Sequence, residues 1–567
     1  MKRHQRGGKL SVQLRGSSRE VVSVERNHSA KNGASFYNKL LEHASASCFL
    51  SRVVESALPS QAQTRRRMAE KSIIIIGAGL AGLATGCYGR MNGYKTRIFE
   101  HHHEPGGVAK AWKHGDYLID GGIHYLMGHR PGQSCHQLYR ELGIFQNRHY
   151  PDLAEYVHFI DEVTGSRVSF TNDLEKLSHD LKKIAPDDSK LIDEFIAGVR
   201  ALQKTDMFAL MKTPSELTGV FGTLKQFWQL RRSLRYFGGI YNKPIWEFAG
   251  IARNESLRRM LAHLFLPEMP AWFMLFLLAL LANRQMGLLE GGCADFTASL
   301  LERYKNLGGE IFFDSTVKEV LVENHRAAGV RLENGVEHRA DAVVSACDGY
   351  STIFKMLDGR YLGGKIKDCY DNWKTLRPLM TISFGVNRSF PNEPAHNFLL
   401  LKENMTIGNV TIDGFPLRFF NYSNKFSPPG KTVVQVLLIT DWKFWNDLRQ
   451  KPARYDAEKK RVTAETLARL EPHYPGITSQ VEVTDIATPY TTWRYTLNHE
   501  GAFMGWSPTS KALRTPLPKT LPGLENFYMA GQWVMPGGGV PPCLYSGRHV
   551  IQILCKRDGK KFSTSFL

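Results

Sequence analysis

The first residues whose types and spacing could do chemistry form a glycine-rich hexapeptide, Gly77-Ala78-Gly79-Leu80-Ala81-Gly82. In the G-x-G-x-x-G pattern the first glycine makes a tight turn and the second lets the backbone approach a pyrophosphate. The third glycine lets a helix pack closely on a strand. Amide groups at the beginning of such a helix bind phosphate because they point outward at the positive end of the helix dipole. The hexapeptide therefore predicts a binding site for a dinucleotide.

The segments around the hexapeptide have the order that this site requires. Four isoleucines, Ile73–Ile76, precede it and predict a strand buried on both faces of a parallel sheet. Residues 83–88 have helical character, and a second predicted strand, residues 95–99, ends at Glu100. A carboxylate about 20 residues beyond the glycines binds ribose hydroxyls and disfavours a 2′-phosphate, and NADP with it. These features do not separate NAD from FAD.

Further glycine-containing segments favour FAD over NAD, because they resemble segments of a known family. Gly106-Gly107 and the following Val108 come soon after Glu100, and the segments 526–532 (NFYMAGQ) and 536–541 (PGGGVP) lie near the other end. Together they resemble the phytoene desaturase, carotenoid isomerase and retinol saturase group of FAD-dependent oxidoreductases. The resemblance implies that FAD is the cofactor and that Gly107, Val108, Gly531, Gly539 and Val540 contact it. Gln532 stands where many relatives carry an acid.

A third segment resembles the part of this superfamily in which the chain returns to the nucleotide domain. It runs from Glu290 to Val317, and the resemblance implies that the backbone of Val317 meets the adenine. Residues 340–346 (ADAVVSA) resemble the next strand. We therefore expect an α/β fold, in which a Rossmann-type FAD-binding domain is combined with a discontinuous α+β substrate domain. The FAD domain is predicted over 71–150, 286–350 and 501–567, and the substrate domain over 151–285 and 351–500.

The two parts of the substrate domain differ in pattern. Residues 151–285 are helix-like and aromatic, whereas 379–384 and 433–438 alternate apolar and polar residues and predict strands. A basic and apolar stretch, residues 224–235, either rests on an anionic membrane or covers the core with a solvated basic face. The segments 488–495 and 501–506 resemble a region near the flavin, and an aromatic wall there suits a long polyene.

Length, charge and cysteine pattern set further limits. A chain of 567 residues invites at least two domains. Its net charge of +19 and pI near 9.4 suit a membrane surface or simple solubility, because no nucleic-acid motif is present. The eight cysteines have neither redox-pair nor metal-ligand spacing, so neither disulfides nor a metal site are expected. The triplet His101-His102-His103 is interpreted as a solvated loop.

Two segments bear on localisation. Residues 1–70 are expected to be a disordered leader, which is either an organellar transit peptide or an over-extended start upstream of Met68. The apolar run over residues 270–282 is shorter than the roughly 20 residues that span a bilayer. We expect a buried helix there, and a cytoplasmic protein peripheral to a membrane, or an imported one if the leader is functional.

The predicted function is FAD-dependent removal or addition of hydrogen across a carbon–carbon bond of a lipophilic isoprenoid or polyene. Alternatives are cis–trans isomerisation of a carotenoid, amine or porphyrinogen oxidation, and flavin binding without turnover at a membrane. Oxygen, a quinone or a separate reductase is the expected electron partner, and nucleic acid is not a partner. No catalytic residue is assigned. His124, Glu290 and Arg494 are candidates for handling the accompanying proton or polarising the site, although residues of these types are more often structural.

Overall fold

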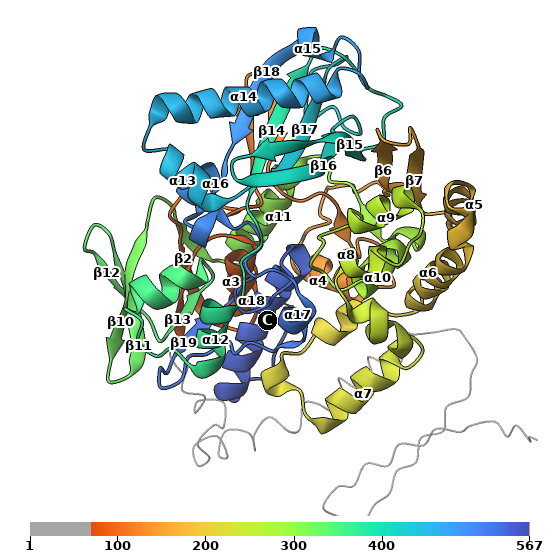
Figure 1. Ribbon diagram of the computed structural model, residues 1–567. Coiled ribbons are helices and arrows are strands. Elements are labelled where there is room, and N and C mark those ends of the chain that lie inside the picture. Colours follow the sequence, from red (N-terminus) through yellow and green to blue (C-terminus); the bar gives the residue numbers. More distant parts are fainter. Residues whose placement is uncertain (1–69, 566–567) are drawn as a thin grey trace, which may run out of the picture. The chain divides into compact units, whose positions relative to one another are not determined.

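The computed structural model describes residues 70–565, apart from the side chains of residues 225–227. The predicted leader and the alternative start at Met68 lie outside the described residues. A five-stranded parallel sheet forms the nucleotide-binding part (Figure 1). Its strands, in spatial order, are β19 (Phe527–Met529), β13 (Ala342–Ser345), β1 (Ser72–Ile76), β2 (Lys95–Phe99) and β9 (Glu310–Phe312).

The isoleucine run forms the centre of this sheet, as predicted. Ile74 of β1 pairs with Val343 of β13 on one side and with Arg97 of β2 on the other. Helix α3 (Leu80–Met91) follows directly and packs against α18 (Val540–Arg557) and α11 (Gly292–Asn306). Because its strands come from both ends and the middle of the chain, the sheet brings these distant segments together. The fold class is therefore as predicted.

A seven-stranded mixed sheet forms the second part. Its strands, in spatial order, are β18 (Val481–Ala487), β14 (Leu379–Val386), β17 (Thr432–Ile439), β16 (Val410–Phe419), β15 (His396–Ile407), β6 (Glu155–Asp161) and β7 (Arg167–Thr171). The alternating segments thus form β14 and β17, as predicted. The expectation that residues 151–285 are helix-like needs correction, since this segment begins with β6 and β7. The alternating sequence 167–171 (RVSFT) carried that signal.

Smaller sheets and the remaining helices complete the structure. The described residues also form three smaller sheets: β3 (Ala111–His114) with β4 (Tyr117–Asp120), β5 (Leu126–Met127) with β8 (Met286–Gly287), and β10 (Val317–Glu323) with β11 (Arg326–Leu332) and β12 (Glu337–Arg339). On the seven-stranded sheet lie α13 (Trp442–Leu448), α14 (Pro452–Leu470) and α15 (Ile477–Gln480). The helical region of residues 174–282 contains α5 (Leu174–Ile184), α6 (Ser189–Leu202), α7 (Val220–Leu230), α8 (Ile245–Ala249), α9 (Glu255–Ala262) and α10 (Trp272–Ala282).

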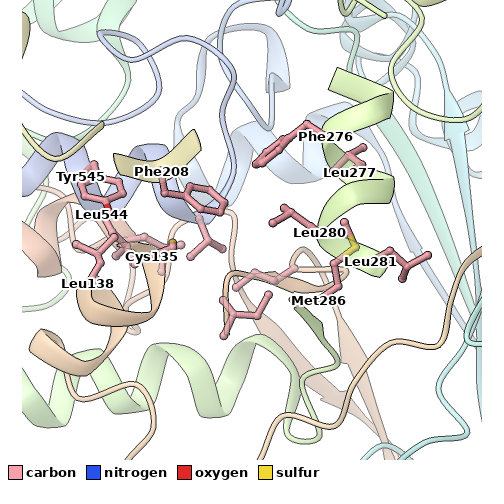
Figure 2. Close-up of a cluster of buried hydrophobic side chains, with 14 of the residues drawn as sticks. Cys135, Leu138, Phe208, Phe276, Leu277, Leu280, Leu281, Met286, Leu544 and Tyr545 are labelled. Atoms are coloured by element: carbon pink, nitrogen blue, oxygen red, sulfur yellow. The ribbon is translucent and has the colours of Figure 1, made fainter. Parts of the chain in front are cut away.

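One hydrophobic cluster joins the helical region to the nucleotide-binding part (Figure 2). Phe276 and Leu280 of α10 lie on one side, Leu544 of α18 lies on the other, and Phe208 lies between them. Cys135 of α4 (Ser134–Glu141) belongs to the same cluster. The apolar run over residues 270–282 is therefore a core helix, as expected. Among the described residues, no helix combines the length and the apolar character needed to cross a membrane.

Residues 351–372 pack on the nucleotide-binding side. They contain a π-helix, Ser351–Met356, and α12 (Gly364–Asn372). Ile353 and Ile366 belong to the same buried cluster as Val343 and Phe527 of the parallel sheet. After residue 350 the chain therefore returns to the seven-stranded sheet only with β14.

Candidate active site

A single large cavity extends from the glycine hexapeptide to the seven-stranded sheet. Its volume is about 1440 Å³. The residues predicted from the sequence to bind a cofactor that line it are Gly77, Gly79, Leu80, Ala81, Glu100, Gly107, Val108, Val317, Gly531, Gly539 and Val540. Ala78 and Gly82 lie just behind this wall. Segments separated by more than 400 residues thus meet at one cavity.

The glycines of the hexapeptide have different structural roles. Gly77 has φ +95°, a conformation that favours glycine. A Cβ on Gly82 would lie 1.9 Å from the Gly77 carbonyl oxygen, so α3 could not pack this closely on the turn with any other residue. A Cβ on Gly79 would meet no atom within 4 Å. The space in front of Gly79 is therefore left open for a ligand, whereas Gly82 is required by the fold.

The beginning of α3 suits an anion. Gly79 is the N-cap, and no side chain caps the helix. The first amides of a helix have no partner within the helix, and they carry the positive end of its dipole. The lining residues Leu80 and Ala81 provide two of these amides. This cradle of backbone donors without a competing side chain matches the diphosphate of a dinucleotide.

Glu100 lies at the end of β2 beside the same turn. Its Oε2 accepts a hydrogen bond from the Ala78 amide (2.5 Å), and its Oε1 accepts one from the His102 amide (2.9 Å). The side chain is buried, and burial raises the pKa of the carboxyl, opposed by those two amide hydrogen bonds. A buried carboxylate fixed next to the phosphate cradle is where a ribose hydroxyl donor would bind.

A second glycine cradle is formed by the C-terminal segment. Gly531, with φ +101°, follows β19, and its amide donates to Ser546 Oγ of α18 (2.7 Å). Gly539 has φ +80° and is the N-cap of α18, again without a capping side chain. A Cβ on Gly539 would meet no atom within 4 Å. This helix end is also open toward the cavity.

Residues 80–552 match the family described as flavin containing amine oxidoreductase. The chain belongs to this family. Prolycopene isomerase from Arabidopsis thaliana is 22% identical over 87% of this chain and 85% of that protein. The lycopene-forming phytoene desaturase from Pseudescherichia vulneris is 23% identical over 85% and 99%. Among solved structures, a variant of putrescine oxidase has a TM-score of 0.55 at 14% identity, covering 86% of this chain and 99% of that one.

The chain is therefore an FAD-dependent oxidoreductase, and the cavity suits this cofactor. The beginning of α3 provides backbone donors for a diphosphate, and the open space at Gly539 leaves room for a flavin; because α18 begins Val540-Pro541-Pro542, only Val540 of these three residues carries an N–H. Glu100 adds an acceptor for a ribose. The cavity also exceeds the roughly 300–1,000 Å³ of a typical single-ligand pocket, which leaves room for a substrate beside FAD.

The three residues considered for proton handling do not lie together. His124 follows β4 and lines the cavity, and burial lowers its pKa well below the ordinary value. Glu290 instead lies 3.4 Å from the imidazole of His149, outside the cavity lining. Arg494 is exposed and rests over the ring of Tyr495 on α16 (Pro489–Thr496). The structure therefore brings only His124 of these three to the cavity.

The segments expected near the flavin contribute unevenly to the wall. Thr492, Phe503 and Met504 line the cavity, whereas Tyr490 and Trp506 do not. Trp506 instead packs edge-on against Trp533. The wall also contains polar residues that the sequence did not single out, namely His396, Asn397, Arg418 and Gln435. They stand in strands among apolar neighbours, and no motif distinguishes them.

The histidine triplet lies close to Glu100. His102, His103 and Glu104 have ligand atoms within 4.8 Å of one another. The Lys110 ammonium contacts Nδ1 of His102, and burial lowers the pKa of this imidazole. The lysine thus occupies one of the two ring nitrogens of His102 that a cation could use. That no metal binds here stays a prediction.

Proposed function

We propose that this FAD-dependent oxidoreductase adds or removes hydrogen across a carbon–carbon bond of a lipophilic isoprenoid or polyene. The observation that carries the proposal is the continuous cavity between the phosphate cradle and the seven-stranded sheet. Its far wall is rich in aromatic side chains, among them Tyr125, Tyr156, Phe208, Phe265, Phe273, Phe276 and Phe398. A polyene is held by dispersion and shape along such a wall. The curated relatives named as carotenoid desaturases and isomerases support the same substrate class.

When bound, FAD supplies the acceptance or return of a hydride equivalent. The chain's own residues bind, orient and exclude water. The backbone at Gly79 would hold the diphosphate of the cofactor and that at Gly539 would lie near its flavin, while Phe273 and Phe276 of α10 line the substrate side. His124 stays neutral near neutral pH because its pKa is depressed by burial, so it is a weak base and serves to shape the wall.

Isomerisation of a polyene is the second candidate. The relative from Arabidopsis thaliana is named prolycopene isomerase, and the same cavity would accept either type of substrate. The two reactions differ in electron balance, because dehydrogenation reduces the flavin stoichiometrically and isomerisation leaves its net oxidation state unchanged. Oxidation of an amine is a third reaction within the same family.

Anaerobic mixing of the holoenzyme with candidate substrates tests the proposal. We expect polyenes in detergent micelles to bleach the blue absorption band of oxidised FAD, or the photoreduced enzyme to be reoxidised by a more unsaturated polyene. A change in the double-bond geometry of the polyene while the reduced enzyme stays reduced would instead assign isomerisation. Bleaching by primary amines but by no polyene would refute the proposal.

We further propose that α7 docks the enzyme on a membrane surface. Val220, Phe221, Leu224 and Trp228 are all exposed on this helix, with 88% of Phe221 and 65% of Trp228 accessible. These positions share one face at helical spacing. The Arg231 guanidinium lies 3.6 Å from the centre of the Trp228 ring. Of the basic and apolar stretch interpreted from the sequence, the side chains of Lys225 and Phe227 lie outside the described residues.

The position of α7 connects docking with substrate supply. It lies at the periphery of the molecule (Figure 1), and Thr223 and Leu230 of the same helix line the cavity. An apolar face with adjacent arginines binds in the interface of an anionic bilayer. A lipophilic substrate could then pass from the bilayer into the cavity past this helix. The proposed location is the cytoplasm, at the periphery of a membrane, or an organelle if the leader directs import.

Vesicle sedimentation tests the docking proposal. The holoenzyme is expected to sediment with vesicles of phosphatidylcholine and phosphatidylglycerol and to be released by salt. The double variant Phe221→Ser, Trp228→Ser should lose this binding while keeping its FAD content. Val336→Ser, which replaces an exposed valine at the end of the small sheet away from α7, is the matched control. Equal sedimentation of both variants would refute docking by α7.

The proposed electron partner is oxygen, a quinone or a separate reductase. Within residues 70–565 there is one parallel sheet, and its glycine cradle is the site proposed for FAD. A second cradle of this kind, which could bind NAD(P)H, is not found among these residues. Reoxidation rates of the photoreduced enzyme in air and with a soluble quinone distinguish the first two. Reoxidation by neither would favour a protein partner.

A further inference from the structure

Three polar side chains form a row across the seven-stranded sheet. In the register of the strands, His396 of β15 pairs with Arg418 of β16, and Arg418 pairs with Gln435 of β17. Directly paired residues project from the same face of a sheet. All three line the cavity, together with the neighbouring Asn397. The apolar wall is thus interrupted by one polar patch, which we call the Arg418 row.

Arg418 is a buried cation without a counter-charge. Only 3% of the residue is accessible. Its Nη1 donates to Gln435 Oε1 (3.0 Å), whereas its Nε has no acceptor. In the part of the chain that the structure describes, no carboxylate forms an ion pair with this guanidinium. A buried charge is tolerated when it is paired, so this position lacks an anion.

The directly paired neighbour of Arg418 also has an unused hydrogen-bonding atom. His396 Nε2 is buried and has no partner in the described chain. Burial and the adjacent guanidinium lower the pKa of His396 to about 3, so its ring is neutral and adds no second charge. Two further neighbours are neutral: Tyr422 lies beside the guanidinium, and the Phe420 ring lies 4.5 Å from it. The buried Asp120 carboxylate interacts with Tyr422 and Cys293, as Arg418 does, but it hydrogen-bonds to Cys293 and forms no ion pair with the guanidinium. Unpaired buried groups around an unpaired cation indicate a missing ligand.

The row is held in a fixed position next to the nucleotide-binding part. Gln435 Nε2 donates to the Asp120 carbonyl oxygen (2.7 Å) and to Ser383 Oγ (3.0 Å). Asp120 ends β4, and the next residues, Gly121 to His124, line the cavity. Because Gln435 uses both its oxygen and its nitrogen in this way, it orients Nη1 of Arg418, while Nε stays without an acceptor. A guanidinium edge with two parallel N–H groups matches the two oxygens of a carboxylate.

We propose that Arg418 binds a carboxylate on the substrate, so that the substrate is an acidic isoprenoid or polyene rather than a hydrocarbon. This inference rests on the proposed function and adds the polar group by which the substrate is held. The aromatic wall binds the chain, and the Arg418 row binds its acidic end. A neutral hydrocarbon would leave Nε of the guanidinium and His396 Nε2 buried and unpaired.

Binding to the oxidised holoenzyme tests the inference without turnover. The probes are a polyene carboxylic acid, its methyl ester and the hydrocarbon of equal length, all in the same neutral detergent. Binding is followed by the perturbation of the flavin absorption band and by quenching of tryptophan fluorescence. We expect the acid to bind about 10- to 100-fold more tightly than the ester, as for a hydrogen bond to a charged group.

Two variants assign the preference to the residue. Arg418→Gln should bind acid and ester equally, and Arg418→Lys, which keeps the charge but not the two parallel donors, should retain part of the preference. Bound FAD and thermal stability show whether each variant is folded. Arg377→Gln is the matched control, because Arg377 lines the same cavity but is paired with Glu268 and half exposed. It should keep the full preference for the acid.

Three outcomes overturn the inference. Equal binding of acid, ester and hydrocarbon to the wild-type enzyme would refute the inference that the substrate carries a carboxylate and would leave the proposed function intact. Binding of none of the three, with FAD still bound, removes the proposed function and this inference together. If Arg418→Gln shifts the flavin spectrum and reduction potential while the acid preference persists, the guanidinium pairs with the flavin instead of the substrate.

Discussion

Replacing Gly79 and Gly82 by alanine separates cofactor binding from folding. Gly79 has φ −67° and ψ 179°, which alanine adopts without strain, and its Cβ would meet no atom within 4 Å. Such a Gly→Ala change stabilises a fold by about 0.4–1 kcal/mol through the unfolded chain. The new methyl group would, however, occupy the space in front of the α3 amides. Losing one hydrogen bond to a charged phosphate costs about 1.5–3 kcal/mol, so the Kd for FAD should rise roughly 10- to 100-fold.

Gly82→Ala should have the opposite effect. Its Cβ would lie 1.9 Å from the Gly77 carbonyl oxygen, and this backbone atom cannot move aside without opening the turn. Overpacking of this kind costs about 1–3 kcal/mol or more. The apo protein should therefore melt at a lower temperature, and its loss of FAD should follow from the loss of structure.

Both variants are measured by thermal unfolding of the apo protein and by titration with FAD, followed by quenching of flavin fluorescence. Wild-type protein should gain about 2.7 kcal/mol of stability at a free FAD concentration 100 times its Kd. Gly79→Ala should keep or exceed the apo melting temperature and lose most of that gain. Wild-type FAD affinity in Gly79→Ala would refute the assignment of the open space to the phosphate. A destabilised apo Gly79→Ala protein would refute the distinction between the two glycines.

Three further predictions concern buried charges. Burial raises the pKa of Glu100 above 4.5, so ionisation of this carboxyl opposes folding, and its contribution to stability falls as pH rises through the folded pKa. In thermal melts, the stability of apo Glu100→Gln relative to apo wild type should therefore rise from acidic to neutral pH. The variant should also bind FAD more weakly than wild type. The pKa values of His124 and His396 are depressed, the latter to about 3, so stability is lost as pH falls below 6.5, by up to roughly 1.4 kcal/mol per pH unit for each imidazole. A double His→Gln variant should flatten this loss in urea titrations, and exposed His179→Gln should not. Arg259→Met leaves the fully buried Asp161 carboxylate without its partner at 2.8 Å, and should cost about 3–5 kcal/mol in urea unfolding without changing the Kd for FAD.

The predictable part of the site is the part encoded by local sequence. The order of Ile73–Ile76, the glycine hexapeptide and the following helix fixes a strand, a turn and a phosphate cradle within about 20 residues. Glu100 follows because the next strand must run parallel to the first and end at the same edge. No pattern in the neighbouring sequence assigns a binding role to Gly531 or Gly539. They were found by resemblance alone, because a glycine loop has the same sequence whether or not a flavin lies beside it.

The Arg418 row could not be predicted in this way, since it depends on strand register. His396, Arg418 and Gln435 are about 20 residues apart in sequence, and each is a single polar residue in a strand with buried neighbours. A shift of one residue in either pairing would turn the guanidinium to the other face of the sheet. The sequence also could not show that β6, from a different insertion, pairs with β15. Long-range pairing decides which polar residues face the cavity.

The two parts of the site therefore solve different physical problems. The phosphate cradle uses backbone amides, which cannot be lost by substitution of a side chain except by filling the space in front of them, as at Gly79. The substrate wall uses side chains, and a single arginine there decides whether the cavity binds an acidic molecule or a neutral hydrocarbon without leaving a buried charge unpaired. Because Gln435 links that arginine to the residue preceding Gly121, the side chain that selects the substrate is held by the same backbone that borders the cofactor. The choice of substrate can thus change by substitution at positions 396, 418 and 435 while the cofactor site stays as it is.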